Sequence, residues 1–232
     1  RDVAPSRGLG DVYKRQLNYN RTFREKHNIT GLLVGVLREN KSGGASSIQT
    51  SLPARNIGLS GRFTYAYDGR YFAEANFGYN GSERFAKNER FGLFPSIGAG
   101  WMISEEKFWN QDLKNIINKL KLKGTYGLVG NDNIGAWNDR FFYMSEVNLN
   151  GSGANFSWGQ DFERNVGTID MIRYRNDKIK WEIAQKMNLG LEVGLFNIFD
   201  IQFDYFTEYR KNIFGERQTI PYEMGFLSLI HI

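Results

Sequence analysis

The segment from Tyr71 to Tyr79 alternates between two kinds of side chain. Its odd positions, such as Tyr71, Phe77 and Tyr79, are apolar or aromatic, whereas its even positions are mostly polar or small. Successive side chains of a strand point to opposite faces, so this period of two predicts a strand with one apolar and one polar face. The pattern recurs along the chain in segments of about ten residues, joined alternately by short turns and long polar loops. That combination is typical of a transmembrane β-barrel.

Composition agrees with β structure and limits the alternatives. The 232 residues include 26 Gly, 12 Tyr and 18 Phe but only 4 Pro, and aromatic residues are enriched in strands. No uncharged apolar run reaches the roughly 18 residues that a membrane-spanning helix needs. The sequence has no cysteine, which excludes thiolate metal sites, disulfides and cysteine nucleophiles. A net charge of +5 is too mild to indicate a nucleic-acid partner.

The two ends of the sequence do not follow the strand pattern. Residues 1–16 and 227–232 resemble translated sequencing-adapter sequence. We therefore expect an adapter scar at 1–16, part of a barrel at 17–226 and a second scar at 227–232, and exclude both ends from fold reasoning.

The interior predicts about eight strands. They cover residues 17–26, 29–38, 55–67, 71–79, 93–104, 120–128, 181–193 and 201–209. Short turns are expected at Lys26-His27-Asn28, at Asp68-Gly69 and at Phe196–Phe199, and Asp68-Gly69 is the strongest hairpin signal. A short helix is expected to begin at a capping Ser104 and to run through Leu113, Ile116 and Ile117. Residues 129–180 are expected to form one long loop, which the outer side of a barrel tolerates.

Several motifs carry a family resemblance. They are Arg84-Phe85, Asn88–Ser96, Gly100–Glu106, Leu120–Lys123, Tyr126–Leu128, Gly130–Gly135 and Trp181-Glu182. In order and spacing they resemble the SusC/RagA family of TonB-linked outer-membrane transporters, over about residues 17–226.

The resemblance implies a fold, a location and partners. The fold would be all-β, with about eight strands of a 22-stranded antiparallel transmembrane barrel and one short helix in a periplasmic connection. The protein would lie in the cell outer membrane, in contact with lipid, and would be energised by the TonB complex. A SusD-like surface lipoprotein would deliver a polar oligomeric substrate, an oligosaccharide or a peptide. The motifs match only the barrel, so no energy-coupling residue is transferred.

The polar face of the strands predicts a set of lumen-facing residues, because Arg or Lys on the lipid face would cost about 2 to 4 kcal/mol at the bilayer midplane. They could line a solute path, or could satisfy one another or a plug inside the barrel. The set is Arg62, Glu74, Asn76, Lys121, Lys123, Glu182, Lys186, Asp204 and Glu208.

Two groups of aromatic residues are candidates for further roles. Those beside the short connections predict an interfacial girdle at headgroup level, the alternative being a core cluster beneath a turn. Those in the long loop are candidates for stacking on sugar rings, the alternative being packing of the loop or contact with the lipoprotein. The girdle set is Tyr67, Tyr71, Trp101, Phe108 and Trp109, and the ligand set is Trp137, Phe141, Tyr143, Phe156 and Trp158.

No catalytic, metal or cofactor site is predicted. Asn131-Asp132-Asn133 lacks the further oxygen ligands of a calcium loop, and an Asx-turn explains it better. Glu105 and Glu106 are adjacent, so helix capping explains them better than glycosidase chemistry.

Two other functions stay open at this stage. One is a soluble β-rich glycan-binding module or glycosidase domain, in which the apolar faces would pack a sandwich core. The other is a porin or a siderophore receptor on a similar barrel.

Overall fold

The computed structural model describes residues 8–42, 51–134, 141, 143–161, 164–216 and 229–231. The chain divides into two compact units. Unit 1 holds Arg1–Ser82, Phe91–Asn131 and Glu182–Lys211, and unit 2 holds Glu83–Arg90, Asp132–Trp181 and Asn212–Ile232.

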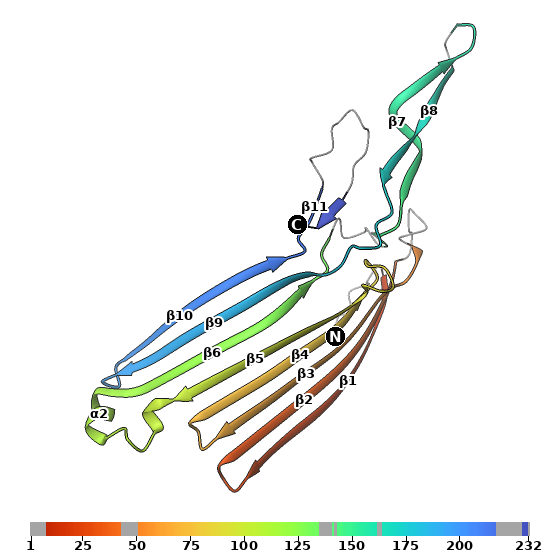
Figure 1. Ribbon diagram of the computed structural model, residues 1–232. Coiled ribbons are helices and arrows are strands. Elements are labelled where there is room, and N and C mark those ends of the chain that lie inside the picture. Colours follow the sequence, from red (N-terminus) through yellow and green to blue (C-terminus); the bar gives the residue numbers. More distant parts are fainter. Residues whose placement is uncertain are drawn as a thin grey trace, which may run out of the picture. The chain divides into compact units, whose positions relative to one another are not determined.

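Unit 1 is one antiparallel sheet of eight strands in the order β1-β2-β3-β4-β5-β6-β9-β10 (Figure 1). The strands are β1 (Gly8–Phe23), β2 (His27–Ser42), β3 (Ala54–Tyr67), β4 (Tyr71–Ser82), β5 (Phe91–Met102), β6 (Ile117–Asn131), β9 (Glu182–Leu195) and β10 (Phe199–Lys211). The predicted antiparallel all-β fold with about eight strands is confirmed, as is the alternation of short and long connections. Strand β1 begins at Gly8, inside the expected adapter segment, and pairs with β2 along its whole length. The origin of residues 1–16 stays a prediction.

The short turns share one end of the sheet. Asp68 and Gly69 have positive φ angles of 53° and 68°, as the hairpin signal predicts. The first turn was predicted two residues too late: Phe23 pairs with His27, which leaves Arg24, Glu25 and Lys26 to reverse the chain. Asn28 tolerates left-handed backbone and suggested the wrong position, since the left-handed residues are Arg24 and Glu25.

The connection after β5 differs from the predicted capped helix. A 3₁₀ turn, η1, spans Ile103–Glu105 and contains Ser104. Helix α2 (Gln111–Ile116) begins after it, with Asn110 at its N-cap position. Ser104 is 1% exposed and does not cap this helix. The prediction of a cap at Ser104 is therefore wrong, because the chain turns once before the helix begins. No described helix is long and apolar enough to span a bilayer.

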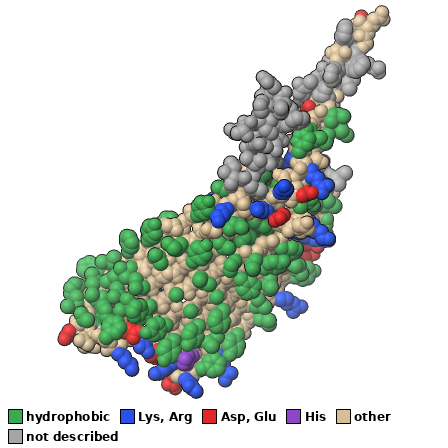
Figure 2. Space-filling view, viewed as in Figure 1, with side chains coloured by type: hydrophobic (Ala, Val, Ile, Leu, Met, Phe, Trp, Pro, Cys, Tyr) green, Lys and Arg blue, Asp and Glu red, His purple; other side chains and the backbone are tan. Residues whose placement is uncertain are grey.

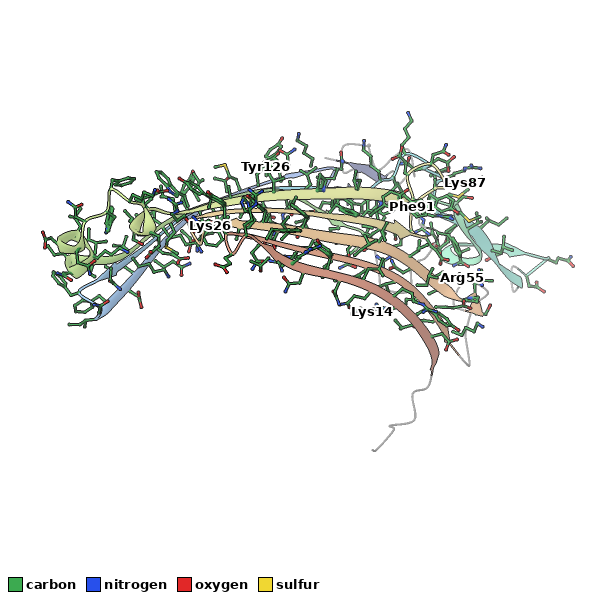
Figure 3. The ribbon with its side chains drawn as sticks, turned by 90° about the horizontal axis from the view of Figure 1, so that it is seen from below. Lys14, Lys26, Arg55, Lys87, Phe91 and Tyr126 are labelled. Atoms are coloured by element: carbon green, nitrogen blue, oxygen red, sulfur yellow. The ribbon has the colours of Figure 1, made fainter. Side chains whose placement is uncertain are left out.

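The two faces of the sheet differ in polarity as predicted. Cross-strand pairing aligns Phe63, Ala75, Ile97 and Tyr126 on one face, which we call the apolar face. It aligns Thr64, Glu74, Gly98 and Thr125 on the other, the polar face. Figure 2 shows hydrophobic side chains spread over the apolar face, with charged ones mainly along its margins. In the edge-on view of Figure 3, Tyr126 and Lys14 lie on opposite sides of the sheet.

Exposure on the two faces is reversed relative to a soluble protein. Along β4 and β5 the apolar positions are exposed and the positions between them are partly covered. Ile97 is 63% exposed, and Phe203 is 66% exposed. Antiparallel sheets in water normally bury the hydrophobic face and expose the polar one.

Unit 2 contains two small hairpins. Strands β7 (Glu146–Trp158) and β8 (Arg164–Arg173) pair antiparallel, and β11 (Phe214–Glu216) pairs with β12 (Leu229–His231). The prediction of a single loop over residues 129–180 is therefore wrong in part, because β7 and β8 form a hairpin within it. Its alternation is weak, since Asn, Gly and Ser separate the few apolar residues of β7.

Candidate functional site

All nine residues predicted to face the lumen lie on the polar face. The register sets Arg62 opposite Asn76, and Lys186 opposite Glu208. It also sets Lys123 beside Gly100 and opposite Gly190, which in turn pairs with Asp204. That this face lines a lumen stays a prediction.

Charged residues on β6, β9 and β10 form one network. Glu192 accepts ion pairs from Lys119 at 2.8 Å and from Lys123 at 3.2 Å, and Lys123 also lies 3.3 Å from Asp204. Glu192 joins the two lysines of this network. It was not among the predicted lumen-facing residues, because its charge alone does not distinguish it in the sequence.

A second network continues toward the loop end of the same strands. Glu208 lies 3.4 Å from Lys186 and 2.5 Å from Arg210, and Arg210 reaches Glu182 at 3.6 Å. Asn131 donates to Glu182 at 3.0 Å.

A separate group lies on β3 and β4, where Glu74 accepts from Arg62 and from Asn76, both at 2.7 Å. Most of the predicted lumen-facing residues thus satisfy one another, which was one of the two alternatives left open by the sequence.

A groove of about 550 Å³ lies on the polar face. Its floor includes Gly98 and Gly100 of β5, and its walls include Thr64, Phe72 and Lys121. The glycines make room for it because they carry no side chain between β4 and β6.

Aromatic residues form a row across the turn end of the apolar face. Tyr67 and Tyr71 have ring centroids 6.3 Å apart, and Tyr71 stacks on Trp101 at 6.4 Å with an interplanar angle of 9°. His27 continues the row, 4.9 Å from Tyr67. Three members of the predicted girdle therefore lie together, although their position at a membrane interface stays a prediction.

The other two predicted girdle residues lie apart from this row. Trp109 follows η1 and donates its indole N–H to the carbonyl of Ile117 at 3.2 Å. Phe108 is 61% exposed in the same connection. At the opposite end of the apolar face, Tyr79 and Phe91 stack at 5.3 Å, a pair that sequence reasoning did not single out.

Glu106 fastens the connection after β5 to the aromatic row. Its carboxylate accepts from the Tyr71 hydroxyl at 2.5 Å, from the Trp101 indole at 3.1 Å and from Arg70 at 3.0 Å. The hydrogen bond from Tyr71, followed by those from Trp101 and Arg70, lowers the pKa of Glu106 below its ordinary value. The prediction that Glu106 caps a helix is therefore wrong: Glu106 follows the 3₁₀ turn, and its side chain contacts the sheet.

Unit 2 has a buried centre of its own, which we call the loop cluster: Phe85, Ile134, Ile179 and Trp181, all less than 9% exposed. The rings of Phe85 and Trp181 are 5.2 Å apart. These residues come from the connections after β4, after β6 and before β9.

Polar contacts to backbone carbonyls tie the loop cluster together. Arg84 donates to the carbonyls of Asp132 at 3.3 Å and Ile134 at 2.6 Å. The Trp181 indole donates to the Arg90 carbonyl at 3.2 Å. Three motifs that carry the family resemblance, around Arg84, Asp132 and Trp181, therefore meet at one place. Sequence analysis assigned no structural role to Arg84 or Trp181.

The predicted ligand-binding aromatics of the long loop are only partly described. Phe141 has a positive φ of 53°, and its carbonyl accepts from the Met144 amide at 2.8 Å. The Tyr143 carbonyl accepts from the Asn176 amide at 3.0 Å. Trp137 and the side chains of Phe156 and Trp158 lie outside the described residues. A ligand role for all five stays a prediction.

No metal site is found in the part of the chain that the structure describes, where no three His, Asp or Glu residues gather around a common point. Asn131 ends β6 and contacts Glu182, and Ile134 donates to the backbone carbonyl of Asp132 at 2.9 Å.

Comparison with known proteins agrees with this geometry. No protein-family model matches the sequence. The chain is 33% identical over 151 residues to the TonB-dependent receptor SusC of Bacteroides thetaiotaomicron, which covers 64% of this chain and 14% of SusC. It is 26% identical over 243 residues to the TonB-dependent receptor P39 of Formosa agariphila, which covers 91% of this chain and 21% of P39.

The fold matches solved structures as well. A structure of the RagAB peptide importer in the closed-closed state superimposes with a TM-score of 0.72 and 21% identity, over 97% of this chain and 26% of that chain. The chain resembles a barrel segment of the SusC/RagA-type TonB-dependent receptors. The resemblance predicted from the motifs is thereby confirmed, and the chain spans about one seventh of the length of SusC and about one fifth of the length of P39.

We predict that Glu106 makes stability depend on pH. Because its pKa is lowered in the folded protein, its contribution is complete above the ordinary carboxyl pKa and is lost as pH falls through the lowered value. In the complete protein, Glu106→Gln should therefore reduce the denaturation midpoint at pH 7, and the difference from wild type should shrink below about pH 4. Glu105→Gln is the control, because the one ion pair of Glu105 among the described residues is with Lys114 at 3.3 Å, and it is partly exposed. An equal difference at both pH values would contradict this role.

We also predict that Arg84 holds the loop cluster together. Arg84→Ala leaves two backbone carbonyls without their donor, which costs about 1 to 3 kcal/mol where they are buried. Hydrogen exchange in residues 132–134 and 179–181 should become faster, whereas exchange in β4 and β5 should not change. Arg175→Ala is the matched control, because Arg175 is exposed and, among the described residues, forms its ion pair with Asp177 at 2.8 Å. Equal effects of the two variants on hydrogen exchange would contradict this role of Arg84.

Proposed function

We propose that this chain forms part of the wall of an outer-membrane transporter that imports a large polar nutrient, an oligosaccharide or a peptide, in a TonB-dependent manner. The observation that carries the proposal is the reversed exposure of the sheet, whose apolar face is the more exposed one. Such a face is stable when hydrocarbon surrounds it, since lipid replaces the protein core as the apolar phase.

The spacing of the aromatic residues supports this placement. Tyr71 and Tyr79 lie on the apolar face at the two ends of β4, eight residues apart. At about 3.4 Å per residue they are about 27 Å apart along the strand. A tilt of about 40° reduces this to about 21 Å along the membrane normal, close to the roughly 25 Å apolar band of known barrels. The Tyr71–Trp101 and Tyr79–Phe91 stacks would then lie near the two headgroup layers.

The polar face suits a passage rather than a reaction site. Its charges are largely paired with one another across neighbouring strands, so the surface is hydrophilic but nearly neutral. Such a surface can pass a hydrated polar solute without holding it strongly. The similar proteins are described as receptors and as a peptide importer, and we infer transport without chemical conversion.

The relatives also suggest the partners. By analogy with SusC and with the RagAB importer, we propose that a SusD-like surface lipoprotein delivers the substrate and that the TonB complex supplies the energy. The soluble sandwich is disfavoured, because a sandwich would cover residues such as Ile97 and Leu122, which are 63% and 44% exposed. A porin or a siderophore receptor would share the barrel but would lack the lipoprotein.

The lipid-facing assignment is tested by a charge on each face of the sheet. Ile97→Arg should destabilise the complete protein in phospholipid vesicles by about 2 to 4 kcal/mol, because Arg is costly on a lipid face. Thr125→Arg, on the polar face of the neighbouring strand, should change stability by less than about 1 kcal/mol. Urea unfolding in vesicles measures both values. Similar losses in the two variants would refute lipid contact of the apolar face.

Transport itself is tested in the native host. Two mixtures are offered to the cells, one of polar oligosaccharides and one of peptides. Deletion of the complete gene should abolish consumption of one of them. Dissipation of the proton-motive force should abolish consumption of the same mixture by the wild type. Uptake of a small sugar through general pores is the control. Cell fractionation should place the protein in the outer membrane, and recovery from the soluble periplasm would overturn the proposal.

A further inference from the structure

Lys121 differs from the other cations of the polar face. Among the described Lys and Arg residues on this face of β3, β6, β9 and β10, five have a carboxylate oxygen within 4 Å: Arg62, Lys119, Lys123, Lys186 and Arg210. Lys121 has none among the described residues, although it lies directly opposite Glu192 in the ladder. Glu192 is already engaged by Lys119 and Lys123.

The Lys121 ammonium is held in place without a close ion pair. It lies 5.2 Å from the centre of the Phe72 ring, a cation–π contact that orients the charge, and Glu192 attracts it only at longer range. A methyl group built on Gly100 would lie 3.5 Å from Phe72 and 3.7 Å from the Lys121 side chain. The aliphatic stem of Lys121 therefore passes close to Gly100.

This charge borders the groove of the polar face. Lys121, Phe72 and Gly100 all line it, together with the hydroxyl-bearing Thr64 and Thr125. The carboxylate of Glu74 also lines the groove, but Arg62 and Asn76 already donate to it. Lys123 and Lys186 also line the groove, but each has a carboxylate partner. The groove thus combines Lys121, which has no such partner among the described residues, with several hydrogen-bonding groups.

We propose that this groove binds a carboxylate flanked by hydroxyl or amide groups, with the Lys121 ammonium donating to the carboxylate. One unit of negative charge matches Lys121, the groove lysine that has no carboxylate oxygen within 4 Å among the described residues, whereas a dianion would leave excess charge beside Glu74. A volume of about 550 Å³ accommodates a short stretch of an oligomer. The carboxylate can come from the imported substrate, in which case the proposal rests on the proposed function, or from another segment of the same complete protein.

Equilibrium binding to the purified complete protein tests the first source. The probes are tetragalacturonate with its methyl ester, and a Ser/Gly hexapeptide with one central Glu and its Gln counterpart. The wild type should prefer the acidic member of one pair by about tenfold or more, and Lys121→Gln should remove most of that preference. Arg210→Gln is the control, because Arg210 lies on the same face but outside the groove, and it pairs with Glu182 and Glu208 rather than with the Glu192 that lies opposite Lys121.

Unfolding of the same variants tests the second source. If a segment of the protein supplies the carboxylate, Lys121→Gln should lower the unfolding midpoint more than Arg210→Gln does, and this difference should persist in a Phe72→Leu background, where the cation–π contact is gone. The proposal is overturned if Lys121→Gln matches Arg210→Gln both in binding preference and in unfolding midpoint. Because neither measurement involves uptake, a failure of the transport proposal would be seen separately, in the native host.

Discussion

The structure of unit 1 depends on one continuous antiparallel ladder. The ladder runs from β1 to β10, which are its two edges. Each strand between these edges pairs on both sides, so its backbone donors and acceptors are satisfied by its neighbours. In hydrocarbon this satisfaction is obligatory, because no water is present to replace a missing hydrogen bond. The ladder also fixes which side chains share a face, since a slip of one residue would reverse every side chain. The apolar and polar faces follow directly from this register.

The two faces use different physical devices. On the apolar face, aromatic rings stack across neighbouring strands near each end, as in Tyr71 with Trp101 and Tyr79 with Phe91. On the polar face, charges pair across strands. Lys121, which has no carboxylate oxygen within 4 Å among the described residues, borders the groove whose floor includes Gly98 and Gly100. Outside the ladder, Glu106 ties the longest turn-end connection to the aromatic row. The loop cluster around Trp181 gives unit 2 a centre of its own.

Sequence reasoning succeeded where the information is local. The eight strands, the Asp68-Gly69 hairpin and the common face of Glu74 and Lys123 all follow from alternation and turn chemistry. It failed where two local signals competed. Asn28 suggested a turn, but the pairing of Phe23 with His27 placed the reversal at Arg24 and Glu25. Ser104 resembled a helix cap, although an additional 3₁₀ turn delays the helix to Gln111.

The sequence by itself determined the strands, their order along the chain and the residues on each face, because the direction of a side chain in a strand depends only on its position. The tertiary structure decided which charges are paired, why Lys121 is not, what Glu106 binds and that Arg84, Ile134 and Trp181 meet. Those contacts join residues that are tens of positions apart, so they exist only after the register of several strands is set. Composition and periodicity carry no information about such distances.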